Sequence, residues 1–185
     1  TEENTVNFQT DLAQTASAGT NAFLYTSPEL MDGLTVVASY QPQAANKESG
    51  TGYGINYSGV EGLTINYATT DVVGTNDDTS GDNTVMKVSY AYGPVTLKWS
   101  NLDHDEGAVA NDMESSAWGV SYTITDDLSV SYGTETHDKG DNTVDSEIDG
   151  ISFAYTTGGM TISGSMTDGK NLDNTNSAGA DVEKW

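Results

Sequence analysis

The sequence predicts an all-β fold, an antiparallel up-and-down transmembrane β-barrel, and three observations support this prediction. Ten segments alternate apolar and polar residues with a period of two, which is typical of strands with one apolar face. The connections alternate between short turns and long polar loops, as in a barrel with tight turns at one rim and large loops at the other. Aromatic residues gather at two levels of the apolar face, with aliphatic residues between them.

The alternation is regular enough to predict each strand. In one segment Leu34, Val36, Ala38 and Tyr40 share a face, because successive side chains of a strand point to opposite sides. The predicted strands are residues 21–27, 34–41, 51–58, 63–70, 84–91, 95–102, 115–123, 128–135, 148–156 and 160–167. The apolar faces match across three short turns under the pairings Tyr57 with Leu63, Tyr90 with Val95, and Tyr122 with Leu128.

Composition and charge exclude several classes of function. The chain has 28 acidic residues against 6 lysines, no arginine, and a formal charge of −22, so a nucleic acid partner is not expected. The acidity favours solvated loops over cation attraction or Ca²⁺ binding. No cysteine is present, which excludes disulfides, thiolate zinc sites and a cysteine nucleophile in this chain. No segment resembles a signal peptide, and no run of about 18 apolar residues predicts a spanning helix.

The aromatic residues of the apolar face predict two girdles at the membrane interfaces, because tyrosine and tryptophan place a ring in hydrocarbon and a polar tip among headgroups. The first row precedes the short turns: Tyr57, Tyr90, Tyr122 and Tyr155. The second row lies toward the long loops: Tyr53, Tyr67, Trp99, Trp118 and Tyr132. The alternative is cross-strand packing pairs in a soluble β-sandwich, which does not explain the two rows.

The opposite face is polar and is predicted to line a water-filled pore. Its predicted pore-lining residues are Lys87, Lys98, Asn56, Asn66, Thr64, Thr96, Ser89, Ser129 and Ser131. In the predicted register Lys87 lies opposite Lys98, and two like charges in that position require an acidic partner or a function. They form either a basic spot on the pore wall or two lysines that extend into water.

Metal-binding and catalytic patterns are weak. Asn101, Asp103 and Asp105 have the spacing of a calcium loop, but Gly107 falls one place late, so solvated loop charge is favoured over Ca²⁺ in the long loops. His104 and His137 are predicted as lone loop histidines. No nucleophile elbow, HExxH motif or phosphate loop occurs, so no enzyme and no other cofactor are predicted.

Two segments resemble the general-diffusion porins of Gram-negative bacteria, particularly those of alphaproteobacteria. They are Asn21-Ala22-Phe23-Leu24-Tyr25-Thr26-Ser27-Pro28 and Gly33-Leu34-Thr35-Val36-Val37-Ala38-Ser39-Tyr40. Two later stretches are similar, Trp118-Gly119-Val120-Ser121-Tyr122 and Gly150-Ile151-Ser152-Phe153-Ala154-Tyr155. The resemblance implies a homotrimer of sixteen-stranded barrels in the bacterial outer membrane, with passive diffusion of small hydrophilic solutes and ions.

The same resemblance divides the chain. Residues 1–20 are either the end of an inward-folded constriction loop or a disordered lead-in, residues 21–167 carry the barrel strands, and residues 168–185 form a long loop and the start of a further strand. Ten strands are too few to close sixteen, so we expect a piece of a longer protein. The family's arginine cluster has no counterpart here. Two alternatives stay open: a secreted or cell-surface acidic β-rich adhesin or Ca²⁺-binding structural protein, and a larger outer-membrane protein such as a plugged transporter.

Overall fold

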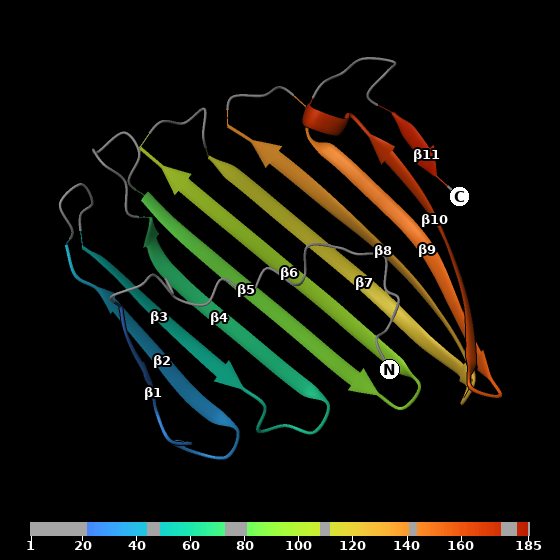
Figure 1. The fold of residues 1–185 in the computed structure, drawn as a ribbon, viewed down its shortest axis with the longest axis horizontal. Coiled ribbons are helices and arrows are strands. Elements are labelled where there is room, and N and C mark those ends of the chain that lie inside the picture. The colour runs from blue at the N-terminus through green and yellow to red at the C-terminus, as the bar shows by residue number, and fades with distance from the viewer. Residues whose placement is uncertain are drawn as a thin grey trace.

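A computed structural model describes residues 22–43, 49–72, 81–107, 112–140, 144–174 and 181–184. In this part of the chain eleven strands form one sheet in the order β1 to β11, and each strand is antiparallel to its neighbour (Figure 1). The strands are β1 (Phe23–Thr26), β2 (Leu34–Gln41), β3 (Gly50–Tyr57), β4 (Leu63–Val72), β5 (Gly81–Tyr92), β6 (Val95–Glu106), β7 (Met113–Thr125), β8 (Leu128–Lys139), β9 (Ser146–Thr157), β10 (Met160–Lys170) and β11 (Val182–Lys184). A short 3-10 helix, η4 (Leu172–Asn174), follows β10.

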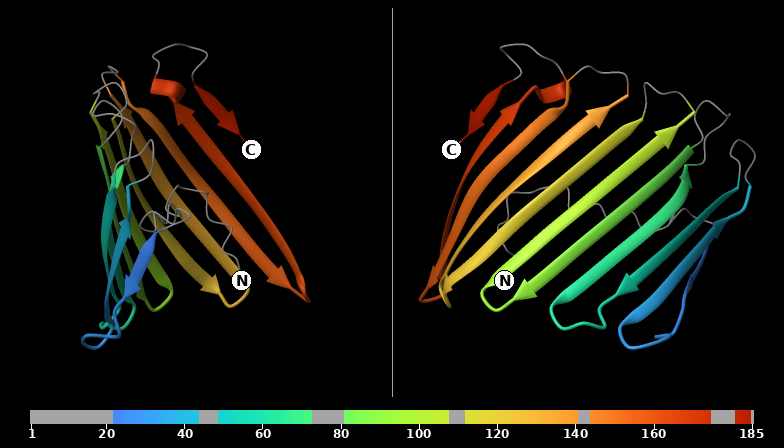
Figure 2. Two further views of the ribbon diagram at one scale, coloured as in Figure 1. Left: turned by 60° about the vertical axis from the view of Figure 1, so that its left-hand side comes forward. Right: turned by 180° about the vertical axis from the view of Figure 1, so that it is seen from behind.

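The sheet is a single curved layer (Figure 2). The predicted up-and-down meander is therefore confirmed, and the two face-packed sheets of the sandwich alternative do not occur among the described residues. No helix in the described ranges is long and apolar enough to cross a membrane. Only three apolar side chains are buried there, namely Val85, Leu102 and Ala117, so this part of the chain has almost no hydrophobic core.

The strands are inclined to the line of short turns, and the pairing gives the angle. A row of directly paired residues starts at Tyr57, the last residue of β3, and ends seven strands later at Asp168. Asp168 lies eight residues beyond Met160, the first residue of β10. Eight residues at about 3.4 Å each, over seven strand spacings of about 4.8 Å, give an inclination of about 40°. Transmembrane β-barrels have a tilt of roughly 35–45°.

Short turns join the two strands of each hairpin at one end of the sheet, which we call the short-turn rim; the opposite end is the long-loop rim (Figure 1). Gly158 and Gly159 both have positive φ, 57° and 82°, as a two-residue type I′ turn requires. In another turn Thr125 Oγ1 accepts hydrogen bonds from the backbone N–H groups of Asp127 and Leu128, at 3.3 and 3.1 Å. Each of these turns reverses the chain within two residues.

The observed pairing corrects the predicted registers of three hairpins. Tyr90 pairs with Leu97 rather than Val95, because Tyr92 and Val95 already pair at the turn. The other two predicted hairpins are wrong by the same two residues, and the observed pairs are Tyr57 with Ile65 and Tyr122 with Val130. A shift of two residues preserves the face of every side chain, so the predicted division into two faces is unaffected.

Candidate functional site

The two faces of the sheet differ along the whole meander. Residues paired directly across antiparallel strands point to the same side. One such row is Asn56, Asn66, Lys87, Ser100, Ala117 and Glu135, and the next row along the strands is Tyr57, Ile65, Val88, Trp99 and Trp118. We call the side of the first row the polar face and the side of the second row the apolar face.

The apolar face is exposed. Leu97 on β6 and Ile151 on β9 are each 50% exposed, and Trp118 on β7 is 48% exposed. Large apolar side chains that remain exposed over such an extent mark a surface that meets another apolar medium or partner. All nine residues predicted as girdles lie on this face: Tyr53, Tyr57, Tyr67, Tyr90, Trp99, Trp118, Tyr122, Tyr132 and Tyr155.

The apolar band has a defined height. On β10 it runs from Met160 to Met166, and the next residue on this face is Asp168. Six residues cover about 20 Å along the strand, which an inclination of about 40° reduces to about 16 Å across the sheet. This is shorter than the band of about 25 Å found in outer-membrane barrels, and aromatic rings at its edges extend it.

Acidic residues occupy the apolar face beyond the band, toward the long-loop rim. They are paired with one another across neighbouring strands: Asp71 with Asp82, Asp82 with Asp105, Asp103 with Glu114, Glu114 with Asp138, and Asp149 with Asp168. Like charges in direct cross-strand positions repel each other, so they require water and counterions. They mark where the apolar band ends.

The polar face carries every residue predicted to line a pore: Asn56, Thr64, Asn66, Lys87, Ser89, Thr96, Lys98, Ser129 and Ser131. Several of their side chains bond across strands. Asn66 Nδ2 donates to Asn56 Oδ1 at 2.8 Å, and the hydroxyls of Ser131 and Ser152 lie 2.6 Å apart. These hydrogen bonds hold the side chains close to the sheet.

The lysines are arranged differently from the prediction. Lys87 pairs with Ser100, and Lys98 pairs with Ser89, so the two charges are diagonal neighbours rather than directly opposed. The predicted pairing was wrong because it inherited the two-residue error in register. Both lysines are half-buried on the polar face and both make further interactions.

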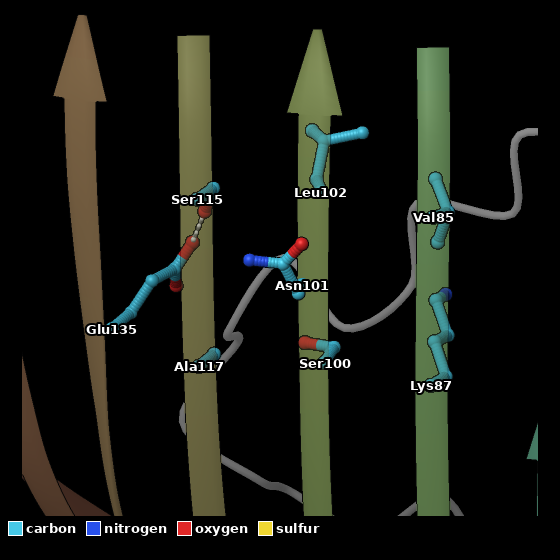
Figure 3. Close-up of a pocket in the computed structure, with 8 residues that line it drawn as sticks. All are labelled: Val85, Lys87, Ser100, Asn101, Leu102, Ser115, Ala117 and Glu135. Atoms are coloured by element: carbon cyan, nitrogen blue, oxygen red, sulfur yellow. Dashed lines mark hydrogen bonds between the residues drawn. The ribbon is translucent and has the colours of Figure 1, made fainter.

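A small cavity lies on the polar face between Lys87 on β5 and Glu135 on β8, above Ser100 and Ala117 (Figure 3). Its volume is about 10 Å³, which is about the room that one water molecule requires. Glu135 is 4% exposed, and Ser115 Oγ donates to its Oε1 at 3.5 Å. The cavity is too small for an organic ligand.

A larger hollow of about 270 Å³ opens at the long-loop rim around Met113. It is lined by acidic and polar residues of β6, β7 and β8 and the segments after them: Asp103, His104, Asp105, Asp112, Glu114, Asp138 and Gly140. Asp112 Oδ1 accepts a hydrogen bond from the backbone N–H of Glu106 at 2.9 Å, which joins the two ends of the β6–β7 connection.

The candidate calcium ligands Asn101, Asp103 and Asp105 lie on strand β6 rather than in a loop. Among the described residues no group of three or more histidine or carboxylate side chains is placed to hold a metal ion. Calcium in the long loops stays a prediction, and several of the acidic loop residues lie outside the described ranges. The 1–20 segment, predicted as a constriction loop or lead-in, also lies outside them.

The two histidines were predicted in loops, and this prediction was wrong. His104 lies on β6 and His137 on β8, because these strands extend four residues beyond their predicted ends. Both side chains are on the polar face, each beside a glutamate: His104 Nε2 is 3.3 Å from Glu106 Oε1, and His137 Nε2 is 2.8 Å from Glu135 Oε1. The period-two pattern, continued past the last apolar residue, is the signal that could have placed them.

A single inclined layer with one exposed apolar face and one polar face is the wall of a transmembrane β-barrel. Residues 2–174 match the family described as Gram-negative porin. The chain therefore belongs to the Gram-negative porin family, whose place is the bacterial outer membrane.

Solved structures agree with this fold. One match is the structure of a porin refined at 1.8 Å resolution, with a TM-score of 0.56 and 18% sequence identity. The match covers 79% of this chain and 55% of that porin, so the chain spans about half the length of the porin. No curated protein matches the sequence.

Proposed function

We propose that this chain forms part of the wall of a water-filled channel that passes small hydrophilic solutes and ions passively across the outer membrane. One observation carries the proposal: the apolar face is exposed over the whole meander while the opposite face bears hydroxyl, amide and lysine side chains. The buried polar residues Ser39, Thr70, Ser115 and Ser152 are all on the polar face, as expected for the inside of the curve. Family membership supports the same function.

The proposed barrel contains more strands than the eleven described. Barrels of 16–18 strands leave an aqueous lumen, whereas barrels of about eight are filled by side chains. With a strand spacing of about 4.8 Å and a tilt of about 40°, sixteen strands close at a radius of about 16 Å, wide enough for water and small solutes. The sixteen strands and the homotrimer follow from the resemblance and belong to this proposal.

The lumen-facing role of Lys87 and Lys98 and the girdle role of the nine aromatic residues are part of the proposal. Polar side chains held against a wall offer no pocket for a specific ligand, which favours diffusion over recognition. A catalytic role is not proposed, because channels of this kind act without chemistry. The adhesin alternative has less support, since membership of the porin family favours a channel.

Ion selectivity tests the proposal. The full-length protein is reconstituted in planar bilayers at about 0.1 M salt, and its reversal potential under a salt gradient is compared with that of a Lys87→Gln, Lys98→Gln double variant. At a distance of about 10 Å in water, the interaction energy between one lysine charge and a passing ion is about 0.4 kcal/mol. Screening by the salt reduces this energy to about 0.15 kcal/mol. Because cations and anions respond in opposite directions, losing both charges raises the cation-to-anion permeability ratio about threefold.

Lys170→Gln is the matched control. Lys170 pairs with Glu147 on the apolar face, so the same loss of charge there is expected to leave the reversal potential unchanged. A folded protein without conductance would end the channel proposal. Conductance with the same reversal potential in the double variant and the control would remove the role given to the two lysines.

A further inference from the structure

Two histidine–glutamate pairs lie on the polar face near the long-loop rim. His104 and Glu106 are two residues apart on β6, and Glu135 and His137 are two residues apart on β8. Side chains two residues apart on a strand share a face, which explains the short contacts of 3.3 and 2.8 Å between Nε2 and carboxylate oxygen. If the polar face lines the lumen, both pairs lie at the mouth of the pore.

The His104 ring is held at both nitrogens. Its Nδ1 lies 2.6 Å from Asn83 Oδ1 on β5, and its Nε2 faces Glu106. When Nδ1–H donates to the amide oxygen, Nε2 donates to the carboxylate only if the imidazole is protonated. Protonation therefore completes a chain of hydrogen bonds from Asn83 to Glu106.

The second pair is less accessible to solvent. Glu135 is 4% exposed and accepts from Ser115 Oγ, while the His137 side chain is 21% exposed. Its backbone is also fixed, because Asn174 Nδ2 of η4 donates to the carbonyl of His137 at 2.7 Å. A charge in such a position is screened less by water and salt than one on a mobile loop.

Further charged and polar residues lie around each histidine. His104 pairs with Met113 on β7, and Met113 pairs in turn with Lys139 on β8, whose side chain is also on the polar face. Asp112 immediately precedes β7 and lines the hollow at the long-loop rim together with His104. His137 pairs with Ser115 on β7 and Ser146 on β9. The charged groups near the two rings on the described elements are therefore Glu106 and Glu135, then Asp112 and Lys139, and at the shared hollow also Asp103, Asp105, Glu114 and Asp138.

We propose that Glu106 and Glu135 are selectivity-determining residues at the long-loop mouth of the pore, and that His104 and His137 make their effect depend on pH. With both imidazoles neutral each pair carries a charge of −1, and with both protonated each pair carries none. Protonation of both imidazoles therefore removes two negative charges from the mouth. The inference rests on the proposed channel function.

Reversal potentials of the reconstituted full-length protein are measured from pH 8 to pH 5 under one salt gradient. The natural sequence is expected to lose cation preference by about threefold as the two charges are neutralised. The His104→Gln, His137→Gln double variant is expected to keep its cation preference down to pH 5, because it has no imidazole at either position to protonate. A Glu106→Gln, Glu135→Gln variant is expected to have low cation preference already at pH 8.

The outcomes separate the two proposals. Absence of conductance from folded protein would count against the channel function itself. Conductance with a reversal potential that stays constant from pH 8 to pH 5 in the natural sequence would overturn the histidine proposal alone, without use of any variant. An equal pH response in the histidine double variant would also overturn it, and the single variants His104→Gln and His137→Gln serve if the double variant does not fold.

Discussion

Arginine substitutions at two neighbouring residues of β7 distinguish the faces of the sheet. Val120 is on the apolar face, paired with Leu97 and Tyr132, and it lies within the apolar band. Ser121 is on the polar face, paired with Thr96 and Ser131. An arginine in the lipid-facing middle of a barrel costs about 2–4 kcal/mol, whereas a polar surface substitution is usually within about 0.5 kcal/mol. We therefore expect Val120→Arg to cost about 2–4 kcal/mol more than Ser121→Arg.

Unfolding of the full-length protein in lipid vesicles measures this difference. Each variant is refolded into phosphatidylcholine vesicles and titrated with guanidinium chloride, with tryptophan fluorescence as the signal. The free energy of unfolding should fall markedly for Val120→Arg and stay close to the parent value for Ser121→Arg. Equal costs, or a larger cost for Ser121→Arg, would refute the assignment of the apolar face to lipid.

Three further predictions use the same titration. Gly33 has φ of 72°, and an added Cβ would lie 2.1 Å from Gly59 N, so Gly33→Ala should lower the free energy of unfolding by more than about 2 kcal/mol. Gly93 has φ of 55° and nothing within 4 Å of an added Cβ, so Gly93→Ala should lower it by about 1 kcal/mol. Equal costs for the two variants would contradict the close approach of Gly33 to Gly59. The Trp118 and Tyr132 rings are edge-on at 5.7 Å, so a double-mutant cycle to alanine should give a coupling of about 0.5–1.5 kcal/mol; zero coupling would argue against the contact. Thr125→Ala should cost about 1 kcal/mol through the lost turn bonds, and a neutral result would show that these bonds do not form.

The sequence predicted the faces of the strands better than their pairing. Every residue assigned to the polar or the apolar face lies there, because alternation is a local property that each strand carries itself. The pairing depends on how tightly the turn closes. The prediction placed Ala91–Pro94 in a four-residue turn, but Gly93 adopts positive φ and only Gly93 and Pro94 turn the chain.

The predicted ends of several strands were also wrong, because the strands continue further toward the long-loop rim. On β6 the apolar alternation ends at Trp99 and the predicted strand at residue 102, whereas backbone pairing continues to Glu106. Interstrand hydrogen bonds do not require apolar side chains, so charged residues can extend a strand into water beyond the membrane. The histidine–glutamate pairs lie in this extension, which is why a prediction based on hydrophobicity placed them in loops.

Cysteine accessibility along β6 is the most direct test of the central claim, that one face of this sheet meets water in a lumen and the other meets lipid. The chain has no cysteine, so each introduced thiol is unique within it. Single cysteines at Thr96 and Lys98 on the polar face, and at Leu97 and Trp99 on the apolar face, are treated in vesicles with a charged, membrane-impermeant thiol reagent. We expect labelling and reduced conductance at 96 and 98 and protection at 97 and 99. Labelling at 97 and 99 with protection at 96 and 98, or equal labelling at all four positions, would contradict it.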